Sequence, residues 1–231
     1  MLRILYHDDQ IVAIDKPEGL LVHRSAEAPD RTTCMTLLRD QLGQLVYPAH
    51  RIDRGTSGVL LFSLNPETAR LLAERFAGRE VEKKYLTLVR GWSPDAGEID
   101  YPLAEEPGMT AADAVTRFRT LAKCELPIPI GNFQMARYSL LLAEPVTGRR
   151  HQIRRHMAHI RHPIAGDIVH GDGRHNRLFR ENFGVHRMIL HAWQLSLPHP
   201  VSGERLDLTA PLPQELGILF SKLGWENVIP G

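Results

Sequence analysis

PAHRIDRGTSGVLLFS, at residues 48–63, places one carboxylate between two arginines and then passes through a Gly-Thr-Ser-Gly turn into an apolar run. The apolar run predicts a strand over residues 58–63. Guanidinium groups beside Asp53 favour its ionised form, which keeps the carboxylate available as a nucleophile or base near neutral pH. Structural ion pairs use the same residue types, so this chemistry alone leaves a catalytic and a structural role for Asp53 both open.

The sequence on either side predicts short helices and strands without regular alternation. Residues 66–77 are typical of a helix, because Asn65 suits the N-cap, Pro66 suits the first helical position, and the apolar residues share one face. Residues 2–23 are expected to form a hairpin with a third strand or extended piece. Further helices are expected over 33–45 and 151–160, strands or extended segments over 84–89, 114–121 and 136–143, a closing hairpin over 188–197 and 205–209, and loops over 93–110 and 162–176. This pattern indicates an α+β fold in one domain over residues 1–231, with a mixed, mostly antiparallel sheet and flanking helices.

Composition excludes several classes of protein. The chain has 231 residues, of which 43% are hydrophobic and 24% charged, as in ordinary globular proteins and unlike fibres or disordered tails. No apolar run approaches the roughly 18 residues that span a bilayer, and the N-terminus lacks the pattern of a secretion signal. Cys34 and Cys124 are the only cysteines and neither belongs to a CxxC pair, so we expect neither a disulfide framework nor a thiolate zinc site. A cytoplasmic protein without membrane contact is therefore expected.

The charge is balanced overall but unevenly distributed. Against a net charge of +1 for the chain, residues 149–187 contain nine arginines, no lysine and three acids, a net charge of +6. Arginine suits planar, bidentate recognition of phosphate and stacking on bases. The segment is therefore interpreted as a nucleic-acid or phosphate face, the alternative being a solvated surface that pairs with acids elsewhere.

Two other features have ordinary explanations beside functional ones. His156, His159 and His162 recur every three residues and drift around a helix, and no HExxH pattern is present, so we predict no metal site. Tyr85 lies in a predicted strand, where an aromatic residue most often packs against neighbours.

Five ordered blocks together resemble the RluA-type pseudouridine synthases. HRIDRGTSG at residues 50–58 is similar to the family hallmark HRLDxxTSG, with Ile52 in place of the common Leu. The other blocks follow in the family's order and cover nearly the whole chain; Ala165 stands where a larger aliphatic residue is frequent. They are DKPEGLLVH at 15–23, KKYLTLVRG at 83–91, TGRRHQIRRH with HIRHPIAGD at 147–167, and LHAWQLSLPHPVSGERLDLTAPLP at 190–213.

The resemblance implies specific roles. It implies that Asp53 is the catalytic nucleophile, that Tyr85 stacks on the target base and takes a proton, and that Arg154 pairs with the catalytic carboxylate. Arg51 is similar to an arginine that enters the RNA helix as the uridine leaves it, which offsets part of the few kcal/mol that base flipping costs. A central RNA-binding cleft is implied, and the RNA-binding residues expected around it are His50, Arg51, Arg54, Arg149, Arg150 and Arg155.

The implied reaction is isomerisation of a uridine in RNA to pseudouridine, an intramolecular transfer that requires neither cofactor nor metal. No S4 domain is expected, because the catalytic strands begin near residue 2. VHRSAE at 22–27, residues 39–54, HGDGRHNR at 170–177 and LGWENVIP at 223–230 look most like the tRNA pseudouridine synthase C branch, which modifies uridine 65 of tRNA. We therefore expect a monomeric enzyme acting on tRNA, with no protein partner implied. The alternatives are a synthase acting on 23S ribosomal RNA or several RNAs, and a non-catalytic RNA-binding protein.

Overall fold

The computed structural model describes residues 1–23, 32–106 and 108–229, so part of the branch-typical segment at 22–27 lies outside the described residues. The chain divides into two compact units. The first contains Met1–Lys83 and His191–Pro211, and the second contains Lys84–Leu190 and Leu212–Gly231. Each unit carries part of the predicted site. No helix in these ranges is long and apolar enough to cross a membrane.

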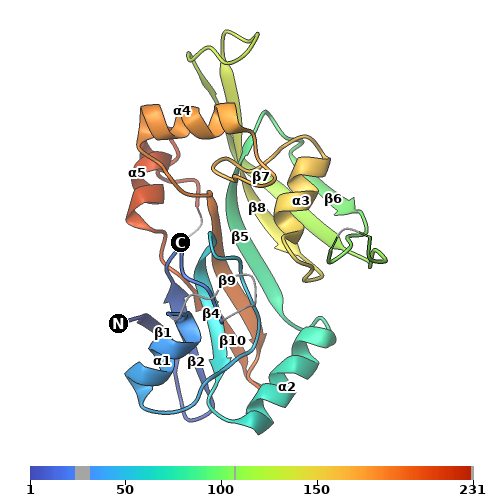
Figure 1. Cartoon of the computed structure of the whole chain (residues 1–231), viewed down its shortest axis with the longest axis vertical. Coiled ribbons are helices and arrows are strands. Elements are labelled where there is room, and N and C mark those ends of the chain that lie inside the picture. The colour runs from blue at the N-terminus through green and yellow to red at the C-terminus, as the bar shows by residue number, and fades with distance from the viewer. Residues whose placement is uncertain (24–31, 107, 230–231) are drawn as a thin grey trace. The chain divides into compact units, whose positions relative to one another are not determined.

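The strands of the first unit form a mixed sheet (Figure 1). Its neighbours pair antiparallel except for β4 and β9, which run parallel. In spatial order the strands are β1 (Arg3–His7), β2 (Ile11–Lys16), β4 (Ser57–Ser63), β9 (Leu190–Pro198) and β10 (Arg205–Thr209), with the short β3 (Tyr47–Pro48) also paired to β4. The predicted strand after Asp53 and the predicted closing hairpin are confirmed.

Gly58, at the start of β4, occupies a position that requires glycine. Its φ is +114°, and a Cβ added there would lie 2.1 Å from the carbonyl oxygen of Ala192 in β9. The neighbouring Ser57 hydroxyl hydrogen-bonds the buried ring of His191 at 2.8 Å. The end of the Asp53 loop is therefore fixed to β9 both by backbone approach and by a buried side-chain contact.

The first unit also holds α1 (Cys34–Leu42) and α2 (Pro66–Ala77). The Asn65 side chain accepts a hydrogen bond from the Thr68 N–H at 2.8 Å, so the predicted start of α2 is confirmed. α1 ends at Leu42, three residues before our predicted limit of 45, and the following Gly43 caps it in a left-handed conformation with φ +68°. Leu72 of α2 packs into a core made with β2, β4 and β9.

In the second unit the strands form an antiparallel series. In spatial order they are β5 (Glu82–Arg90), β8 (Ala136–Pro145), β7 (Val115–Leu126) and β6 (Ala96–Asp100). The α+β class with a mostly antiparallel, mixed sheet is therefore confirmed. β7 and β8 are longer than predicted and form a long hairpin, visible in yellow-green in Figure 1.

The prediction of a continuous loop over 93–110 was wrong, because β6 lies within it. β6 is an edge strand in which only Ile99 is buried, so its sequence lacks the apolar alternation that indicates a strand. Gly97 brings its backbone so close to the Phe118 ring that an added Cβ would lie 2.8 Å from it. Close approach to the partner strand, rather than side-chain pattern, defines this element.

Three helices complete the second unit: α3 (Gln152–His159), α4 (Gly173–Phe183) and α5 (Gln214–Lys222). α3 was predicted, but α4 begins inside the segment predicted as a loop over 162–176, and α5 was not predicted. Asp172 caps α4 by accepting the Arg174 N–H at 3.0 Å. Phe179 of α4 and Phe220 of α5 share one buried cluster, and Figure 1 shows α5 below one end of α4. Tertiary packing of a few apolar residues stabilises both helices.

Candidate active site

A buried lysine holds the loop that carries Asp53. Lys16, at the end of β2, has no exposed surface, and its ammonium donates to the carbonyls of Pro17, Leu20 and Arg54 at 2.8, 2.8 and 3.2 Å. A buried charge is tolerated only with such partners. Lys16 therefore fastens the 17–20 turn and the Asp53 loop to the same point.

Backbone contacts reinforce this arrangement. The Gly19 N–H donates to the Arg54 carbonyl at 2.8 Å, and the Arg54 Nε donates to the Gly19 carbonyl at 2.9 Å. The Asp53 carbonyl accepts the Thr56 N–H at 3.0 Å. The half-buried Asp53 side chain is thus presented from a loop with few remaining degrees of freedom. Such rigidity keeps a reactive group in one position before substrate arrives.

Two predicted RNA contacts near Asp53 differ in their surroundings. Arg51 is exposed and forms no hydrogen bond or ion pair with any residue in the described part of the chain. His50 stacks on Phe76 at 5.2 Å, and its Nε2 accepts the Leu61 N–H at 3.2 Å. Burial, with a smaller contribution from the charge of Lys83, lowers the pKa of His50 to about 3. His50 is therefore neutral and fixes the loop to β4 and α2.

Tyr85 occupies a half-buried position near the start of β5, opposite Ala143 of β8. It packs against a cluster that includes Ile153 and Met157 of α3. The packing explanation for an aromatic residue in a strand is correct for part of the ring. The rest of the side chain is partly exposed, and its role in stacking on a base stays a prediction.

Arg154 forms a buried ion pair with Asp167. Its Nε and Nη2 donate to the two carboxylate oxygens of Asp167 at 2.7 and 2.9 Å, and the side chains are 8% and 1% exposed. Burial alone would raise the pKa of Asp167, but hydrogen bonds from Arg154 and from the N–H groups of His170 and Val169 outweigh it, so the pKa lies below its usual value. The bidentate pair fixes the plane of the guanidinium.

The loop that carries Asp167 is itself held by α4. Asn176 is buried, accepts the Gly166 N–H and donates to the Asp167 carbonyl, both at 2.8 Å. Gly166 has φ +81°, and a Cβ there would lie 1.9 Å from the Arg187 carbonyl oxygen. α4 therefore positions Arg154 indirectly, by holding the loop of its partner Asp167. The sequence did not predict this connection. The Gly-Asp pair at the end of the HIRHPIAGD block was its one visible signal.

The remaining predicted RNA contacts lie against Ala104, Glu106 and Asp113. Arg149 donates to the Asp113 carbonyl at 3.1 Å, and Arg155 donates to the Ala104 carbonyl at 2.7 Å. Arg150 lies 3.9 Å from the carboxylate of Glu106. These arginines therefore already contact residues of their own unit, and RNA contact by them stays a prediction.

The clustered histidines have separate partners. His156 is buried between the Thr116 hydroxyl at 2.9 Å and the Tyr101 carbonyl at 3.0 Å. His159 stacks on the Tyr101 ring at 3.8 Å, and His162 bonds the Arg90 carbonyl at 2.8 Å. Each of these histidines therefore has its own partner and is typical of a residue that stabilises the fold.

The predicted catalytic residues are divided between the units. Asp53 belongs to the first unit, whereas Tyr85 and Arg154 lie on adjacent packed elements of the second. An arginine has five N–H donors, and Asp167 accepts two of them, so Arg154 has the capacity to hold a second carboxylate. The meeting of all three side chains stays a prediction.

Comparison with known proteins agrees with these features. A family model described as RNA pseudouridylate synthase matches residues 10–159. A relative named tRNA pseudouridine synthase C from Vibrio cholerae serotype O1 is 48% identical over 98% of this chain and 98% of its own length. A relative of the same name from Yersinia pestis is 46% identical over 100% of this chain and 94% of its own.

Solved structures show the same arrangement of elements. Human RNA Pseudouridylate Synthase Domain Containing 4 is 25% identical, covers 96% of this chain and 93% of its own, and superimposes with a TM-score of 0.73. Human RNA Pseudouridylate Synthase Domain Containing 1 gives the same identity and TM-score over 92% of this chain and 84% of its own. Both similarities extend over elements of both units.

Proposed function

Because the chain belongs to the RNA pseudouridylate synthase family, we propose that it is a tRNA pseudouridine synthase that isomerises uridine 65 of tRNA, with Asp53 as its nucleophile. The tRNA substrate is supported by the names of relatives that are 48% and 46% identical over essentially the full chain. The two units together make one catalytic domain over residues 1–231 in this proposal, which is supported by the extent of these similarities.

The observation that carries the catalytic assignment is the buried Arg154–Asp167 pair. An arginine this fixed can present its remaining donors to one place, and a carboxylate there is held ionised and oriented. In the proposal that carboxylate is Asp53, whose own loop is fastened by Lys16. Both partners are thus preorganised before RNA binds.

The reaction rearranges bonds within one nucleotide. The N1–C1′ glycosidic bond breaks, the uracil turns while held in the site, and a C5–C1′ bond forms. The C5 proton is lost and N1 gains one, so the sum is an isomerisation that consumes no co-reactant. Asp53 acts as nucleophile in the first stage, and Tyr85 stacks on the base and takes the proton.

The chain's charged surface residues bind and open the RNA in this proposal. Arg51 enters the helix in place of the flipped uridine, which its exposure and lack of a described partner support. His50 orients the loop, and Arg54, Arg149, Arg150 and Arg155 contact the backbone. A monomeric, cytoplasmic enzyme without protein partner, membrane contact, cofactor or metal completes the proposal.

Modification maps test the substrate. A strain lacking the gene, complemented with wild type or with Asp53→Asn, is analysed for pseudouridine in tRNA and in 23S ribosomal RNA. Loss of pseudouridine at position 65 of tRNA, restored only by wild type, is expected. Loss confined to ribosomal RNA would keep the chemistry and overturn the tRNA assignment, and unchanged maps would favour a protein that only binds RNA.

A further inference from the structure

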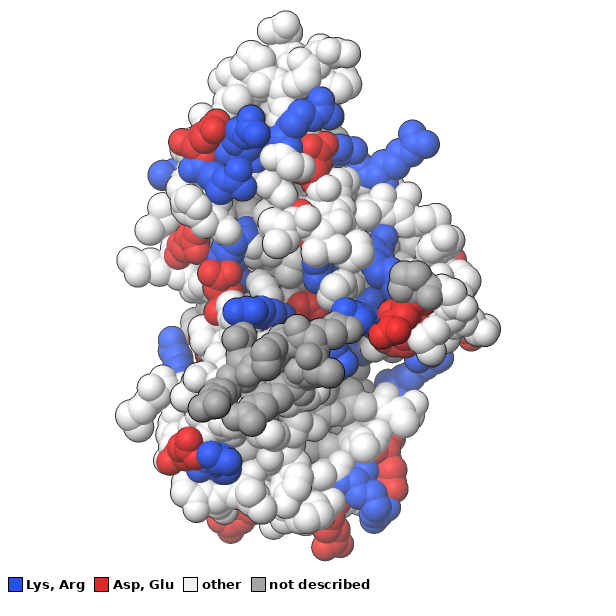
Figure 2. Space-filling view, in the orientation of Figure 1, with Lys and Arg blue, Asp and Glu red and all other residues white. Residues whose placement is uncertain are grey.

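α4 presents a row of arginines on its exposed face. Arg174, Arg177 and Arg180, here called the α4 arginine stripe, are all exposed and recur every three residues. Their backbone positions span about 9 Å along the helix axis. The side chains of Arg177 and Arg180 form no hydrogen bond or ion pair with a residue that the structure describes. Figure 2 shows basic side chains gathered over α4, with a few acidic side chains beside them.

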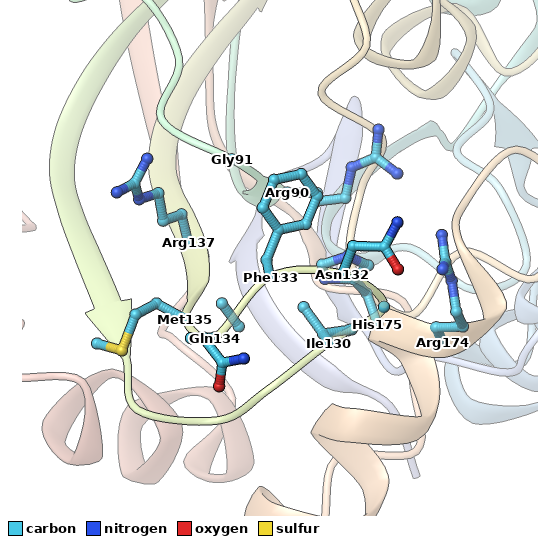
Figure 3. A pocket seen from close by; sticks show the side chains of 12 residues that line it. Arg90, Gly91, Ile130, Asn132, Phe133, Gln134, Met135, Arg137, Arg174 and His175 are labelled. Carbon is cyan, nitrogen blue, oxygen red and sulfur yellow. The ribbon is translucent and has the colours of Figure 1, made fainter.

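A cavity of about 590 Å³ adjoins the start of this helix, and we call it the β8 pocket (Figure 3). It lies entirely within the second unit, and none of the described residues that line it is acidic. Its size falls within the roughly 300–1,000 Å³ of small-ligand sites, so one nucleotide can fit. The lining residues are Arg90, Gly91, residues 130–136, Arg137, Arg174 and His175.

Arginine side chains line several parts of the β8 pocket. Arg137 donates through Nε to Glu125 at 2.6 Å and remains 53% exposed. Arg174 is 70% exposed, with its Nε 3.7 Å from Asp172. Arg90 is neutralised by Asp172 at 2.7 Å. The terminal nitrogens of Arg137 and Arg174 are therefore the cationic donors that an anion would reach.

Exposed aromatic surface accompanies these arginines. Phe133 is 73% exposed, and Figure 3 shows its ring standing out from the loop, with Arg137 on one side of it and Arg174 on the other. The Arg137 guanidinium lies 4.2 Å above the ring of Trp92, which is 46% exposed. Met135, which lines the same pocket, is also exposed at 37%. Exposed apolar side chains that gather at one place are typical of a binding surface, whereas single ones are not.

We propose that the β8 pocket and the α4 arginine stripe form a second RNA-binding site, which holds one unpaired nucleotide and the phosphates beside it. The base stacks on Phe133, Arg137 and Arg174 contact its phosphate, and Arg177 and Arg180 contact the next phosphates along the strand. Stacking on an aromatic face combined with arginine–phosphate contacts is the usual chemistry of single-stranded RNA recognition.

The second site is separate from the position of the target base. Tyr85 and Arg90 are five residues apart on the same extended strand, which places them about 17 Å from each other. A single RNA that reaches both positions is anchored at two points, so binding becomes stronger without any change at the reacting uridine. This inference rests on the proposed action on RNA, and it adds a contact that explains the exposed stripe.

The chemistry of the pocket favours RNA over a small anion or an acidic peptide. A free phosphate would not require the exposed Phe133 ring, and a peptide carboxylate would leave the stripe beyond the pocket without a role. Burial lowers the pKa of His175 to about 4, so this residue is neutral near pH 7 and the positive charge comes from the arginines alone. Binding should therefore depend on salt and not on histidine protonation.

The test measures binding of an unmodified tRNA transcript by Asp53→Asn protein, which keeps the RNA unconverted. Into this background we introduce Arg174→Ala/Arg177→Ala/Arg180→Ala or Phe133→Ala. The matched control is Arg39→Ala/Arg70→Ala/Arg75→Ala, which removes the same charge from α1 and α2, where each arginine pairs with a neighbouring acid. Circular dichroism confirms that each variant is folded.

We expect the stripe variant to lower affinity by roughly tenfold and to reduce the slope of log K against log salt by about 2, as for three phosphate contacts at about 0.7 each. Phe133→Ala should weaken binding at least about fivefold, the lower range for loss of one base stack. Transcripts containing 4-thiouridine should crosslink to the peptide that contains residues 130–137. Equal affinity and slope in the stripe and control variants, or crosslinks that avoid this peptide, would overturn the inference.

Failure of the inference and failure of the proposed function give different results. If wild type isomerises tRNA while the stripe variant binds as the control does, only the second site is wrong. If wild type isomerises no tRNA uridine while RNA binding and crosslinks still depend on the stripe and Phe133, the second site stands and the proposed function is wrong.

Discussion

Replacing Asp167 by Asn should disturb catalysis through Arg154, because Asp167 is its buried bidentate partner. Breaking a buried ion pair by removing one charge costs about 3–5 kcal/mol of unfolding free energy. The N–H groups of Val169 and His170, which also donate to this carboxylate, lose a charged acceptor. We therefore expect Asp167→Asn to lie near the upper half of that range.

Urea unfolding followed by circular dichroism measures the stability, and single-turnover pseudouridine formation on a tRNA transcript measures the chemistry. The matched control is Glu82→Gln, which removes an acid whose side chain is 58% exposed and pairs with Arg205 at 3.1 Å. Exposed pairs contribute only about 0–1 kcal/mol. In conditions where Asp167→Asn is still folded, the rate of the chemical step should fall more than the affinity for RNA.

The lowered pKa of Asp167 also predicts how the stability depends on pH. Its pKa is lowered in the folded state, so the pair stabilises the protein above the unfolded-state pKa of about 3.9 and the stabilisation is lost as the pH falls through the folded value. Asp167→Asn should remove this acid dependence. A destabilisation no larger than that of Glu82→Gln, with an unchanged chemical step, would refute the view that Asp167 positions Arg154.

Other predictions concern the scaffold. Gly58→Ala should lower the free energy of unfolding by about 2–4 kcal/mol, because its Cβ would lie 2.1 Å from the Ala192 oxygen. The control Gly217→Ala, whose Cβ meets nothing closer than 3.9 Å, should leave the melting temperature unchanged or raise it. Equal melting temperatures for the two variants would contradict the close-approach argument. Lys16→Met should lower the free energy of unfolding, measured in urea, by about 3 kcal/mol or more, because three carbonyls lose their buried donor. A loss under about 1 kcal/mol would contradict the role of Lys16 in holding the Asp53 loop. The pKa of His50 is about 3 in the folded state and about 6.5 in the unfolded state. As the pH falls from 6.5 toward 3, His50 should therefore lower the free energy of unfolding by up to about 1.4 kcal/mol per pH unit. His50→Gln should flatten this dependence of stability on pH, and an unchanged dependence would show that another group is responsible.

Local signals were sufficient where one residue determines an element boundary. α2 begins where Asn65 and Pro66 predict it, because capping and a fixed φ act within a few residues. β6 was not predicted, because its formation depends on a residue distant in sequence. α4 was missed although Asp172 caps its start and Gly184 its end, and its contacts with a preceding loop could not be inferred from sequence. Gly97 of β6 lies against Phe118, and Asn176 of α4 bonds the backbone of residues 166 and 167.

The candidate site shows the same division. Composition and spacing identified Asp53 as a carboxylate between two arginines but left its role open, and the resemblance supplied Tyr85 and Arg154. Asp167 is 13 residues from Arg154, and only the fold of the intervening loop brings the two together. The β8 pocket combines the ends of β5, β8 and α4, so no single segment of sequence indicates it.

The central claim is that Asp53 converts a tRNA uridine to pseudouridine. Its most direct test treats a tRNA transcript with purified wild type, Asp53→Asn or the exposed control Asp40→Asn, labels pseudouridine chemically, and maps the stops of reverse transcriptase. We predict a stop reporting position 65 with wild type and Asp40→Asn and none with Asp53→Asn, while Asp53→Asn binds the RNA within about tenfold of wild type, or about 1.4 kcal/mol. The same stop with Asp53→Asn would contradict the assigned nucleophile, and no stop with wild type would contradict the proposed activity on tRNA.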